Sequence, residues 1–334
     1  MSGPIVHGGG ITAAARLYGG GFEDWLDLST GINPNPVTIP VLPQAVWHRL
    51  PDQGLAEAAR MAASRHYRSG ACLPLPVPGT QSVIQLLPRL GAQGRRVAIL
   101  SPTYGEYRRV FELASFDVDA IFDLDEIRAE HGLVVVVNPN NPDGRIFSAD
   151  RLIALQQRLA DQDGLLIVDE AFGDASPAES VAGLAADVAN LIVFRSFGKF
   201  FGLAGLRLGF VIAGPSLLDR FEEWLGPWAV SGPALSLAAS CLGGETGVVS
   251  RRIAERSRAL RHVLAEAGLA VVGGTDLFAL VADRHAPAIY DHLCRHRILV
   301  RKFNYADDWL RFGLAPDEHA DRRLAQALGG LERR

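Results

Sequence analysis

One lysine stands out among the residues that can do chemistry. The 334-residue chain holds 33 lysines and arginines, but only Lys199 and Lys302 are lysines. An arginine stays protonated, whereas a lysine amine can lose its proton and form a Schiff base with an aldehyde. Lys199 lies in the segment R-S-F-G-K-F-F-G-L-A-G-L-R-L-G-F, residues 195–210, which is rich in small residues. We therefore expect amine chemistry at Lys199; the plain alternative is a solvated lysine in a surface loop.

Anion-binding groups accompany this lysine. Ser196 supplies a hydroxyl and Arg207 a fork-shaped cation, a combination that suits a phosphate dianion. Gly79, Thr80 and Gln81 precede an expected helix, and the first N–H groups of a helix have no partner within it. The sequence thus predicts a second anion contact at this helix start.

A nucleotide-binding P-loop is a competing interpretation of the dipeptide Gly198-Lys199. It requires a glycine five residues before Gly198, where this chain has Val193. It also requires a serine or threonine after the lysine to hold magnesium, where this chain has Phe200. We therefore reject it.

The elements that must position these groups alternate between strands and helices. Apolar runs predict strands at 97–100, 118–122, 133–137, 165–168 and 191–194 and an extended segment at 73–78. Helices are expected at 55–68, 82–90 and 149–160, with one more ending at residue 113. This alternation predicts an α/β fold with a mostly parallel sheet covered by helices on both faces.

Six polar or reactive residues each follow one of these expected strands. Open α/β sheets bind ligands at the carboxyl ends of their strands, so the six are expected to share one site. They are Thr80, Tyr104, Asn141, Asp169, Ser196 and Lys199.

The remainder of the chain predicts a smaller α+β lobe. Helices are expected at 215–242, with interruptions at Trp224, Pro227 and Trp228, and at 251–267 and 287–296. Short strands are expected at 277–281, 298–301 and 309–314, and a helix at 11–18 is followed by a rigid proline-rich loop at 27–36. We predict a large domain at 36–245 and a small domain made of 1–35 and 246–334.

Composition excludes several classes of function. The chain is 48% hydrophobic and 21% charged with net charge -4, and no basic cluster follows a nucleic-acid backbone. No apolar run is long enough to span a bilayer, and no signal peptide precedes the first helix. Three widely spaced cysteines, Cys72, Cys241 and Cys294, predict no disulfide framework. A cytoplasmic enzyme is expected, without nucleic-acid or membrane partners.

A metal site is an alternative interpretation of residues 292–296. His292, Cys294 and His296 are spaced for a shared ion, but Arg295 and Arg297 would repel a cation and no further ligand lies nearby. We expect no metal.

Four segments carry a resemblance to a known family. P-T-Y-G-E-Y, N-P-N-N-P-D-G, D-E-A-F and the lysine segment resemble the class I/II aminotransferases, which are fold type I pyridoxal-phosphate enzymes. The terminal motifs H-G-G-G, D-L-S-T-G-I-N-P and W-L-R-F-G-L look more like those of the threonine-phosphate decarboxylases of cobalamin biosynthesis. The similarity covers nearly the whole chain.

The resemblance implies a role for each site residue. Lys199 would bind the aldehyde of pyridoxal 5'-phosphate, Asp169 would pair with the ring nitrogen and Tyr104 would stack on the ring, while Asn141 would bond the ring hydroxyl. The cofactor phosphate would be met by Gly79, Thr80, Gln81, Ser196 and Arg207. Substrate groups would be met by His7, Gly8, Gly31, Asn141, Arg301 and Arg311.

The sequence departs from the family pattern at several positions. Phe172 stands where many relatives have a tyrosine that reaches the ring oxygen, and Gly198 replaces a hydroxyl residue before the lysine. Gly31 replaces an asparagine, so any substrate contact there is expected through the backbone. Leu50 lies where aminotransferase relatives carry a tyrosine that reaches the neighbouring subunit, which puts that contact in doubt but not the dimer.

The resemblance implies decarboxylation of O-phospho-L-threonine to (R)-1-amino-2-propanol O-2-phosphate and carbon dioxide, by a homodimer. A histidinol-phosphate-type aminotransferase is the alternative, since both activities need Lys199 and Asp169. His7 with its glycines, and the absent tyrosines at Leu50 and Phe172, favour the decarboxylase. A third interpretation, a cofactor-binding transcriptional regulator, needs a DNA-binding domain ahead of the fold, and the family-like segments begin at His7.

Overall fold

The computed structural model describes residues 5, 7–175 and 177–331. The α-helices are α1 (Ile11–Tyr18), α2 (Ala45–His48), α3 (Gln53–Tyr67), α4 (Thr80–Ile84), α5 (Glu106–Leu113), α6 (Ala149–Ala160), α7 (Phe197–Phe200), α8 (Pro215–Leu225), α9 (Gly232–Leu242), α10 (Gly247–Glu266), α11 (Ala286–Arg295) and α12 (Glu318–Gly329). The strands are β1 (Leu26–Asp27), β2 (Leu75–Val77), β3 (Arg96–Leu100), β4 (Val118–Ile121), β5 (His131–Val137), β6 (Leu165–Asp169), β7 (Leu191–Ser196), β8 (Gly209–Ala213), β9 (Val271–Thr275), β10 (Phe278–Ala282), β11 (Ile298–Leu299), β12 (Arg301–Phe303) and β13 (Ala306–Gly313).

A seven-stranded sheet forms the larger part of the molecule, with strand order β2-β8-β7-β6-β5-β3-β4. Strands β4, β3, β5, β6 and β7 are mutually parallel, whereas β8 is antiparallel to both of its neighbours, β2 and β7. Strand β2 therefore runs in the same direction as β7. The predicted mostly parallel sheet is confirmed, and all the strands that precede predicted site residues end at one edge.

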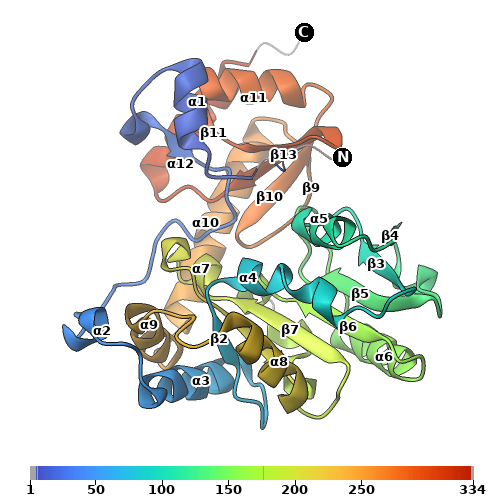
Figure 1. Ribbon diagram of the computed structural model, residues 1–334. Helices are drawn as coiled ribbons and strands as arrows, with labels where there is room; N and C mark the ends of the chain where they lie inside the picture. The colour runs from blue at the N-terminus through green and yellow to red at the C-terminus, as the bar shows by residue number, and fades with distance from the viewer. Residues whose placement is uncertain (1–4, 6, 176, 332–334) are drawn as a thin grey trace.

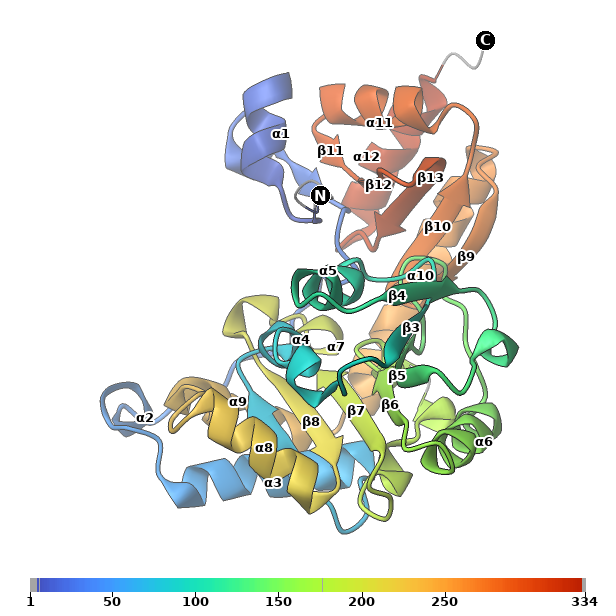
Figure 2. The same ribbon diagram turned by 45° about the vertical axis from the view of Figure 1, so that its right-hand side comes forward.

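The central strands are apolar because helices cover both of their faces. Strand β5 reads H-G-L-V-V-V-V and is buried at every position except Gly132. A strand with only one buried face would alternate between apolar and polar residues. Helices α3, α8, α9 and α6 lie along the sheet in Figures 1 and 2.

A second, smaller group of elements lies above this sheet in Figure 1. Its four-stranded antiparallel sheet has the order β12-β13-β10-β9, and β1 pairs with β11 in a separate parallel ladder. Helix α10 extends between the two sheets, and α1 packs against α11, so both ends of the chain belong to the upper group (Figures 1 and 2). The domain boundaries given above stay a prediction.

One expected helix was wrong in extent. The helix expected at 82–90 begins at Thr80 and ends at Ile84, and a separate 3-10 turn covers Leu87–Leu90. Pro88 explains the break, because it has no N–H to continue the ladder. The interruption expected within 215–242 is confirmed: α8 ends at Leu225, next to Gly226 with a φ of 74°, and α9 begins at Gly232.

Within the described residues, no helix is both long enough and apolar enough to cross a membrane. The cysteines Cys72, Cys241 and Cys294 are all free.

Candidate active site

A cavity of about 350 Å³ lies at the carboxyl edge of the large sheet. It is lined by all of the predicted site residues except Gly79 and Arg301. Those lining it are His7, Gly8, Gly31, Thr80, Gln81, Tyr104, Asn141, Asp169, Ser196, Lys199, Arg207 and Arg311. The structure therefore brings together residues from both ends and the middle of the chain, as predicted from the sequence.

Lys199 and Asp169 are neighbouring opposite charges in this cavity, the first half-buried and the second buried. Asp169 is the last residue of β6 and only 4% exposed, while Lys199 lies in the short helix that directly follows β7. Burial lowers the pKa of Lys199, and the Asp169 carboxylate opposes that shift. Burial also raises the pKa of Asp169, with Lys199 acting in the opposite direction. A lysine with a depressed pKa is a better amine nucleophile near neutral pH.

Tyr107 supports Asp169 and was not identified from the sequence. Its hydroxyl donates to Asp169 Oδ2 at 2.8 Å, and the backbone N–H of Ala171 donates to Oδ1 at 2.9 Å. Both bonds favour the ionised carboxylate. Tyr107 belongs to the motif P-T-Y-G-E-Y, but it lies 62 positions before Asp169 in the chain. The sequence contains no signal for that pairing.

The predicted phosphate contacts meet at one end of the cavity. Arg207 takes a positive φ of 53° in the turn before β8, and Thr80 is the first residue of α4. Gly79 lies beside them: a Cβ there would be 2.8 Å from Arg207 Nη2, and its φ of 75° also favours glycine. Gly79 is thus required for the close approach of Arg207, although it does not line the cavity itself.

Gly198 has a similar packing reason. A Cβ at this position would lie 2.6 Å from the Cα of Ala204. A larger residue before the lysine therefore has no room in this chain. Ser196 supplies a hydroxyl at this end of the cavity.

A second cavity of about 450 Å³ adjoins the first and shares His7, Gly8, Tyr104, Asn141 and Arg311 with it. Arg301 lines this outer cavity, directly opposite Arg311 in the β12–β13 ladder.

Arg311 is held by neutral groups. It donates from Nη1 to Asn141 Oδ1 and, at 2.9 Å, from Nη2 to Ser29 O. Burial, with the neighbouring Arg301, lowers its pKa to about 10. Burial likewise lowers the pKa of Arg301. Among the described residues, neither guanidinium forms a salt bridge with an acidic side chain.

Aromatic rings close the side of the cavity near Gly31. The rings of Phe172 and Phe278 meet edge to face at 5.1 Å, and Lys199 Nζ lies 4.9 Å from the centroid of Phe172. A Cβ at Gly31 would lie 2.9 Å from Phe278 and 3.0 Å from Phe172. A side chain at position 31 would therefore clash with both phenylalanine rings, and any ligand contact at Gly31 uses the backbone.

A polar chain connects the N-terminal segment to the cavity. His7 Nε2 is 3.0 Å from Oε1 of the buried Glu106, whose Oε2 accepts from Gln81 Nε2 at 3.3 Å. Gln81 Oε1 in turn accepts from the hydroxyl of Tyr104 at 3.0 Å. Burial raises the pKa of Tyr104 to about 12. Glu106 is a second residue that the sequence reasoning missed.

These groups fit pyridoxal phosphate, the cofactor that the sequence predicts. The cavity provides a half-buried amine at Lys199, a buried carboxylate at Asp169 and an aromatic ring at Tyr104. Ser196 and Arg207 offer a hydroxyl and a guanidinium together, which suits the phosphate.

The rings of His292 and His296 lie 4.4 Å apart, but a nitrogen of each meets a backbone carbonyl. His292 Nε2 lies 2.8 Å from Ala327 O, and His296 Nδ1 lies 2.9 Å from His292 O. Within the described chain, the only acidic or histidine cluster of metal-binding size is Asp119, Glu130 and His131. Its Asp119 carboxylate is already bound by the guanidinium of Arg96.

Comparisons with known proteins are consistent with this geometry. A model of the aminotransferase class I and II family matches residues 23–328. A threonine-phosphate decarboxylase of Sinorhizobium sp is 59% identical, with 99% of this chain and 100% of that protein covered. A threonine-phosphate decarboxylase of Pseudomonas aeruginosa is 42% identical, with 98% of each chain covered.

A solved structure shows the same fold. The histidinol-phosphate aminotransferase of Sinorhizobium meliloti, solved in complex with pyridoxal-5'-phosphate, superposes with a TM-score of 0.80. The match covers 97% of this chain and 94% of that chain at 23% sequence identity. At that identity the similarity is one of fold.

Proposed function

The chain belongs to the aminotransferase class I and II family, and from that premise we propose that it is a pyridoxal-phosphate-dependent decarboxylase of O-phospho-L-threonine. The products are (R)-1-amino-2-propanol O-2-phosphate and carbon dioxide, for use in cobalamin biosynthesis. Support comes from two threonine-phosphate decarboxylases, 59% and 42% identical over nearly the whole chain.

One observation carries the substrate class. Arg301, which is half-buried, and Arg311, which is buried, both line the outer cavity, and among the described residues neither forms a salt bridge with an acidic side chain. Arg301 and Arg311 lie opposite each other on paired strands, and burial lowers the pKa of both. A buried cation is costly unless an anion or hydrogen bonds compensate it. Phosphothreonine carries two anionic groups, a carboxylate and a phosphate, and can compensate both arginines.

Each cavity residue has a defined task in this proposal. Lys199 would hold the cofactor aldehyde, and Asp169, whose ionised form Tyr107 and the N–H of Ala171 favour, would pair with the ring nitrogen. Tyr104 would stack on the ring, and Asn141 would reach the ring hydroxyl from the loop after β5, where its Oδ1 accepts from Arg311 of β13. The phosphate of the cofactor is met by Thr80, Gln81, Ser196 and Arg207, with Gly79 leaving room for the arginine.

The choice between decarboxylation and amino transfer is a matter of orientation. The bound pyridoxal ring supplies an electron sink for the bond that breaks at the substrate Cα. Arg301, Arg311, His7 and the backbone at Gly8 and Gly31 would therefore orient the substrate so that its Cα–carboxylate bond breaks, whereas an aminotransferase would orient it so that the Cα–H bond breaks. Phe172, which offers no hydroxyl to the ring oxygen, distinguishes this cavity from that of many transaminating relatives.

The test is to incubate the purified holoenzyme with O-phosphothreonine and no keto acid. We expect carbon dioxide and the amino-propanol phosphate in equal amounts, with unphosphorylated threonine at least tenfold poorer in kcat/KM, because it leaves one arginine without an anion. Turnover that occurs only when 2-oxoglutarate is supplied would assign the chain to the aminotransferases instead. Lys199→Ala serves as the inactive control.

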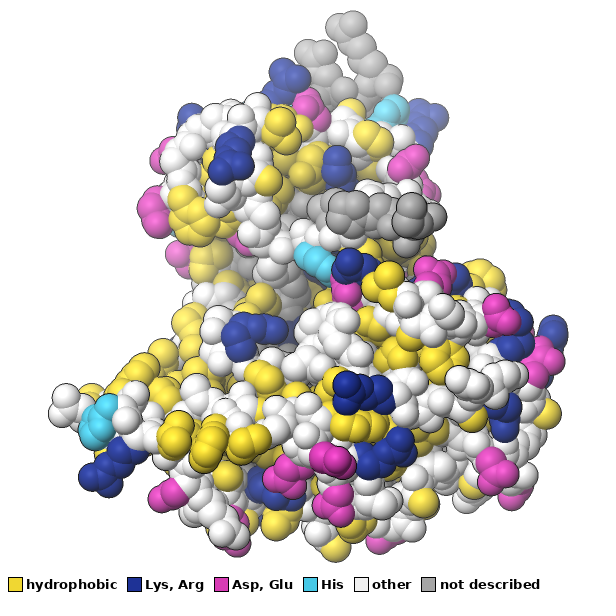
Figure 3. Space-filling view, viewed as in Figure 1, with side chains coloured by type: hydrophobic (Ala, Val, Ile, Leu, Met, Phe, Trp, Pro, Cys, Tyr) yellow, Lys and Arg dark blue, Asp and Glu magenta, His cyan; other side chains and the backbone are white. Residues whose placement is uncertain are grey.

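We further propose that the working unit is a cytoplasmic homodimer. The segment before α3 exposes Val41, Trp47 and Leu50, with Trp47 and Leu50 both 67% exposed. Figure 3 shows hydrophobic side chains, in yellow, on the projection at the lower left that carries α2 in Figure 1. Free cysteines are typical of a reducing compartment.

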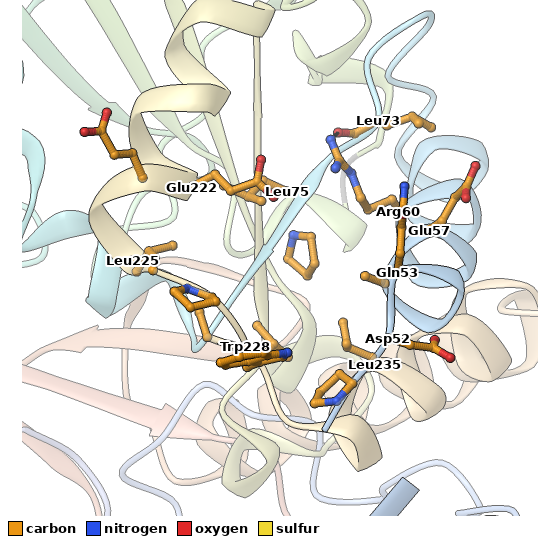
Figure 4. A pocket seen from close by; sticks show the side chains of 18 of the residues that line it. Asp52, Gln53, Glu57, Arg60, Leu73, Leu75, Glu222, Leu225, Trp228 and Leu235 are labelled. Carbon is orange, nitrogen blue, oxygen red and sulfur yellow. Dashed lines mark hydrogen bonds between the residues drawn. The ribbon is translucent and has the colours of Figure 1, made fainter. Parts of the chain in front are cut away.

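A groove next to this projection extends the same surface. It has a volume of about 880 Å³, with Trp228 and Leu225 on one side and Glu57 and Arg60 of α3 on the other (Figure 4). An apolar projection beside a groove that holds Leu225, Trp228 and Leu235 among charged side chains suits a two-fold contact between copies of one chain.

A further inference from the structure

A buried carboxylate lies directly behind the lining of the anion-binding cavities. Glu106 is the first residue of α5, and its side chain is 5% exposed. It does not line either cavity, but its neighbours His7, Gln81 and Arg109 do. A negative charge at this place would repel an anionic substrate, so its presence requires an explanation.

Glu106 joins three separate parts of the chain. Its Oε1 bonds to His7 Nε2 at 3.0 Å, and its Oε2 accepts from Gln81 Nε2 at 3.3 Å and lies 3.6 Å from Arg109 Nη1. Because a carboxylate oxygen accepts, His7 Nε2 is the donor of their bond. Both carboxylate oxygens are thus occupied by donors, which shields the charge from the cavity.

The N-terminal segment is held from the opposite side as well. The N–H of Gly9 donates to Ser29 Oγ at 2.7 Å, and a side chain at Gly8 would overlap the carbonyl of Ser29. That carbonyl accepts from Arg311 Nη2 at 2.9 Å. Residues 7–9 therefore span the mouth of the cavities, with Ser29 as the attachment on one side and Glu106 on the other.

We propose that Glu106 is a positioning residue for substrate binding, which anchors His7 and so keeps residues 7–9 closed over the cavities. The proposal rests on the proposed function for its substrate. Glu106 itself touches no substrate; it fixes the imidazole of His7 and the amide of Gln81, and through Gln81 the hydroxyl of Tyr104. Substrate affinity is set through His7 and the closed position of residues 7–9, whereas the bond-breaking step at Lys199 is not.

Kinetics of Glu106→Gln, His7→Ala and the double variant test this coupling. Glu106→Gln keeps the shape of the side chain but loses the charge-assisted bond, so we expect KM for O-phosphothreonine to rise about tenfold with kcat within about threefold of wild type. Since Glu106 acts through His7, the double variant should be no more than about twofold worse in KM than His7→Ala alone. Multiplicative effects, an unchanged KM, or a loss confined to kcat would overturn the proposal.

Hydrogen exchange of the holoenzyme without substrate gives a second readout. We expect the amides of residues 7–10 to exchange about tenfold faster in Glu106→Gln and in His7→Ala than in wild type. His7→Ala changes a half-exposed side chain, so it tests the same contact without altering the protein interior. Glu255→Gln, an exposed glutamate on α10, is the matched control and should leave exchange and kinetics unchanged.

The two readouts separate the two hypotheses. If exchange is faster in Glu106→Gln and His7→Ala but the wild type releases no carbon dioxide from phosphothreonine, the proposed function is wrong and the anchoring role is supported. Decarboxylation by wild type, with neither KM nor exchange altered in Glu106→Gln, would overturn the anchoring role alone.

Discussion

At the scale of single residues, the candidate site consists of charges withdrawn from water and compensated in specific ways. Asp169 is compensated by Lys199, Tyr107 and a backbone N–H. The guanidinium of Arg311 donates instead to neutral oxygens of Asn141 and Ser29, and among the described residues it forms no salt bridge with an acidic side chain. The first arrangement suits a permanent partner such as a pyridinium ring, and the second suits an anion that enters and leaves.

Lys199 and Arg207 could be predicted from the sequence because they lie in one continuous motif. Tyr107 and Glu106 could not, since each works through a residue far away in the chain: Tyr107 through Asp169, and Glu106 through His7. Nothing local distinguishes a supporting tyrosine from a core tyrosine such as Tyr67.

Tyr107→Phe is expected to lower kcat/KM for phosphothreonine about tenfold, because it removes a hydrogen bond to a charged group. It should also weaken retention of the cofactor on dialysis, since Asp169 loses a bond that favours its ionised form. Absorbance after dialysis and initial rates measure the two effects.

Tyr67→Phe is the matched control for this change. Tyr67 is 4% exposed, and its hydroxyl has no hydrogen-bond partner among the described residues. Its removal should leave activity and cofactor retention unchanged. Equal losses in both variants would show that ring packing, not the bond to Asp169, matters at Tyr107.

At the scale of elements, the asparagine loop after β5 is fixed against the small sheet by backbone contacts. The N–H of Gly274 in β9 donates to Asp143 O at 2.9 Å, and a Cβ at Gly273 would lie 2.1 Å from the same oxygen. Asp143 also accepts from Arg145 N at 3.0 Å within the loop. These contacts hold Asn141 beside Arg311.

Gly144→Ala is expected to destabilise the protein by at least about 2 kcal/mol, from left-handed backbone strain plus a steric clash. The φ of Gly144 is +72°, and a Cβ there would lie 1.9 Å from Gly274 O. Gly94→Ala isolates the strain: its φ is +79°, with nothing within 4 Å of a Cβ. If the two variants unfolded at the same urea concentration, the contact with β9 would not limit stability.

Acid stability should depend on the junction of β3, β4 and β5. Hydrogen bonds from Arg96, and then from His131, hold the pKa of Asp119 well below its usual range, although partial burial opposes them. A carboxyl with a depressed folded pKa adds stability above its unfolded pKa of about 3.9, and that stability is lost as the pH falls through the folded pKa.

Asp119→Asn should therefore have a lower urea midpoint than wild type at pH 7. The difference should shrink progressively below about pH 4. Urea titrations followed by circular dichroism at several pH values measure it. A difference that grows toward acid pH would contradict the assignment.

The five mutually parallel strands of the large sheet, β3 to β7, could be predicted because their sequences are mostly apolar. Strand β9 was missed because V-V-G-G-T holds two glycines, which weaken a strand signal. Those glycines are present for the backbone contact with the loop after β5, a fact available only from the fold. Strand β8 was also missed: it begins at Gly209, within the lysine motif, and its reversed direction in the sheet has no sequence signature.

At the scale of the whole molecule, the cavities lie between two groups of elements that each supply half of the site. The large sheet contributes Asp169 and Lys199, and β12 and β13 of the small sheet contribute Arg301 and Arg311. The N-terminal segment links the two groups through Ser29 and Glu106. Opening and closing of this mouth is the motion that we expect substrate binding to control.

The proposed homodimer predicts that Trp47→Glu yields a monomer or a dimer at least tenfold weaker in sedimentation velocity, since it places a charge in a buried apolar contact. Tyr305→Glu changes another large side chain, 56% exposed, that lies outside the projection, and it should leave the mass unchanged. A wild-type protein that sediments as a monomer at micromolar concentration would contradict the dimer.

The most direct measurement of the central claim is to reduce the holoenzyme with borohydride and locate the attached pyridoxyl group by peptide mass spectrometry. With only two lysines in the chain, the result is unambiguous. We predict stoichiometric labelling of Lys199, with Lys302, whose amine lies over the ring of Tyr290, unlabelled. A label on Lys302, or none on either lysine in a protein that still consumes phosphothreonine, would contradict the account.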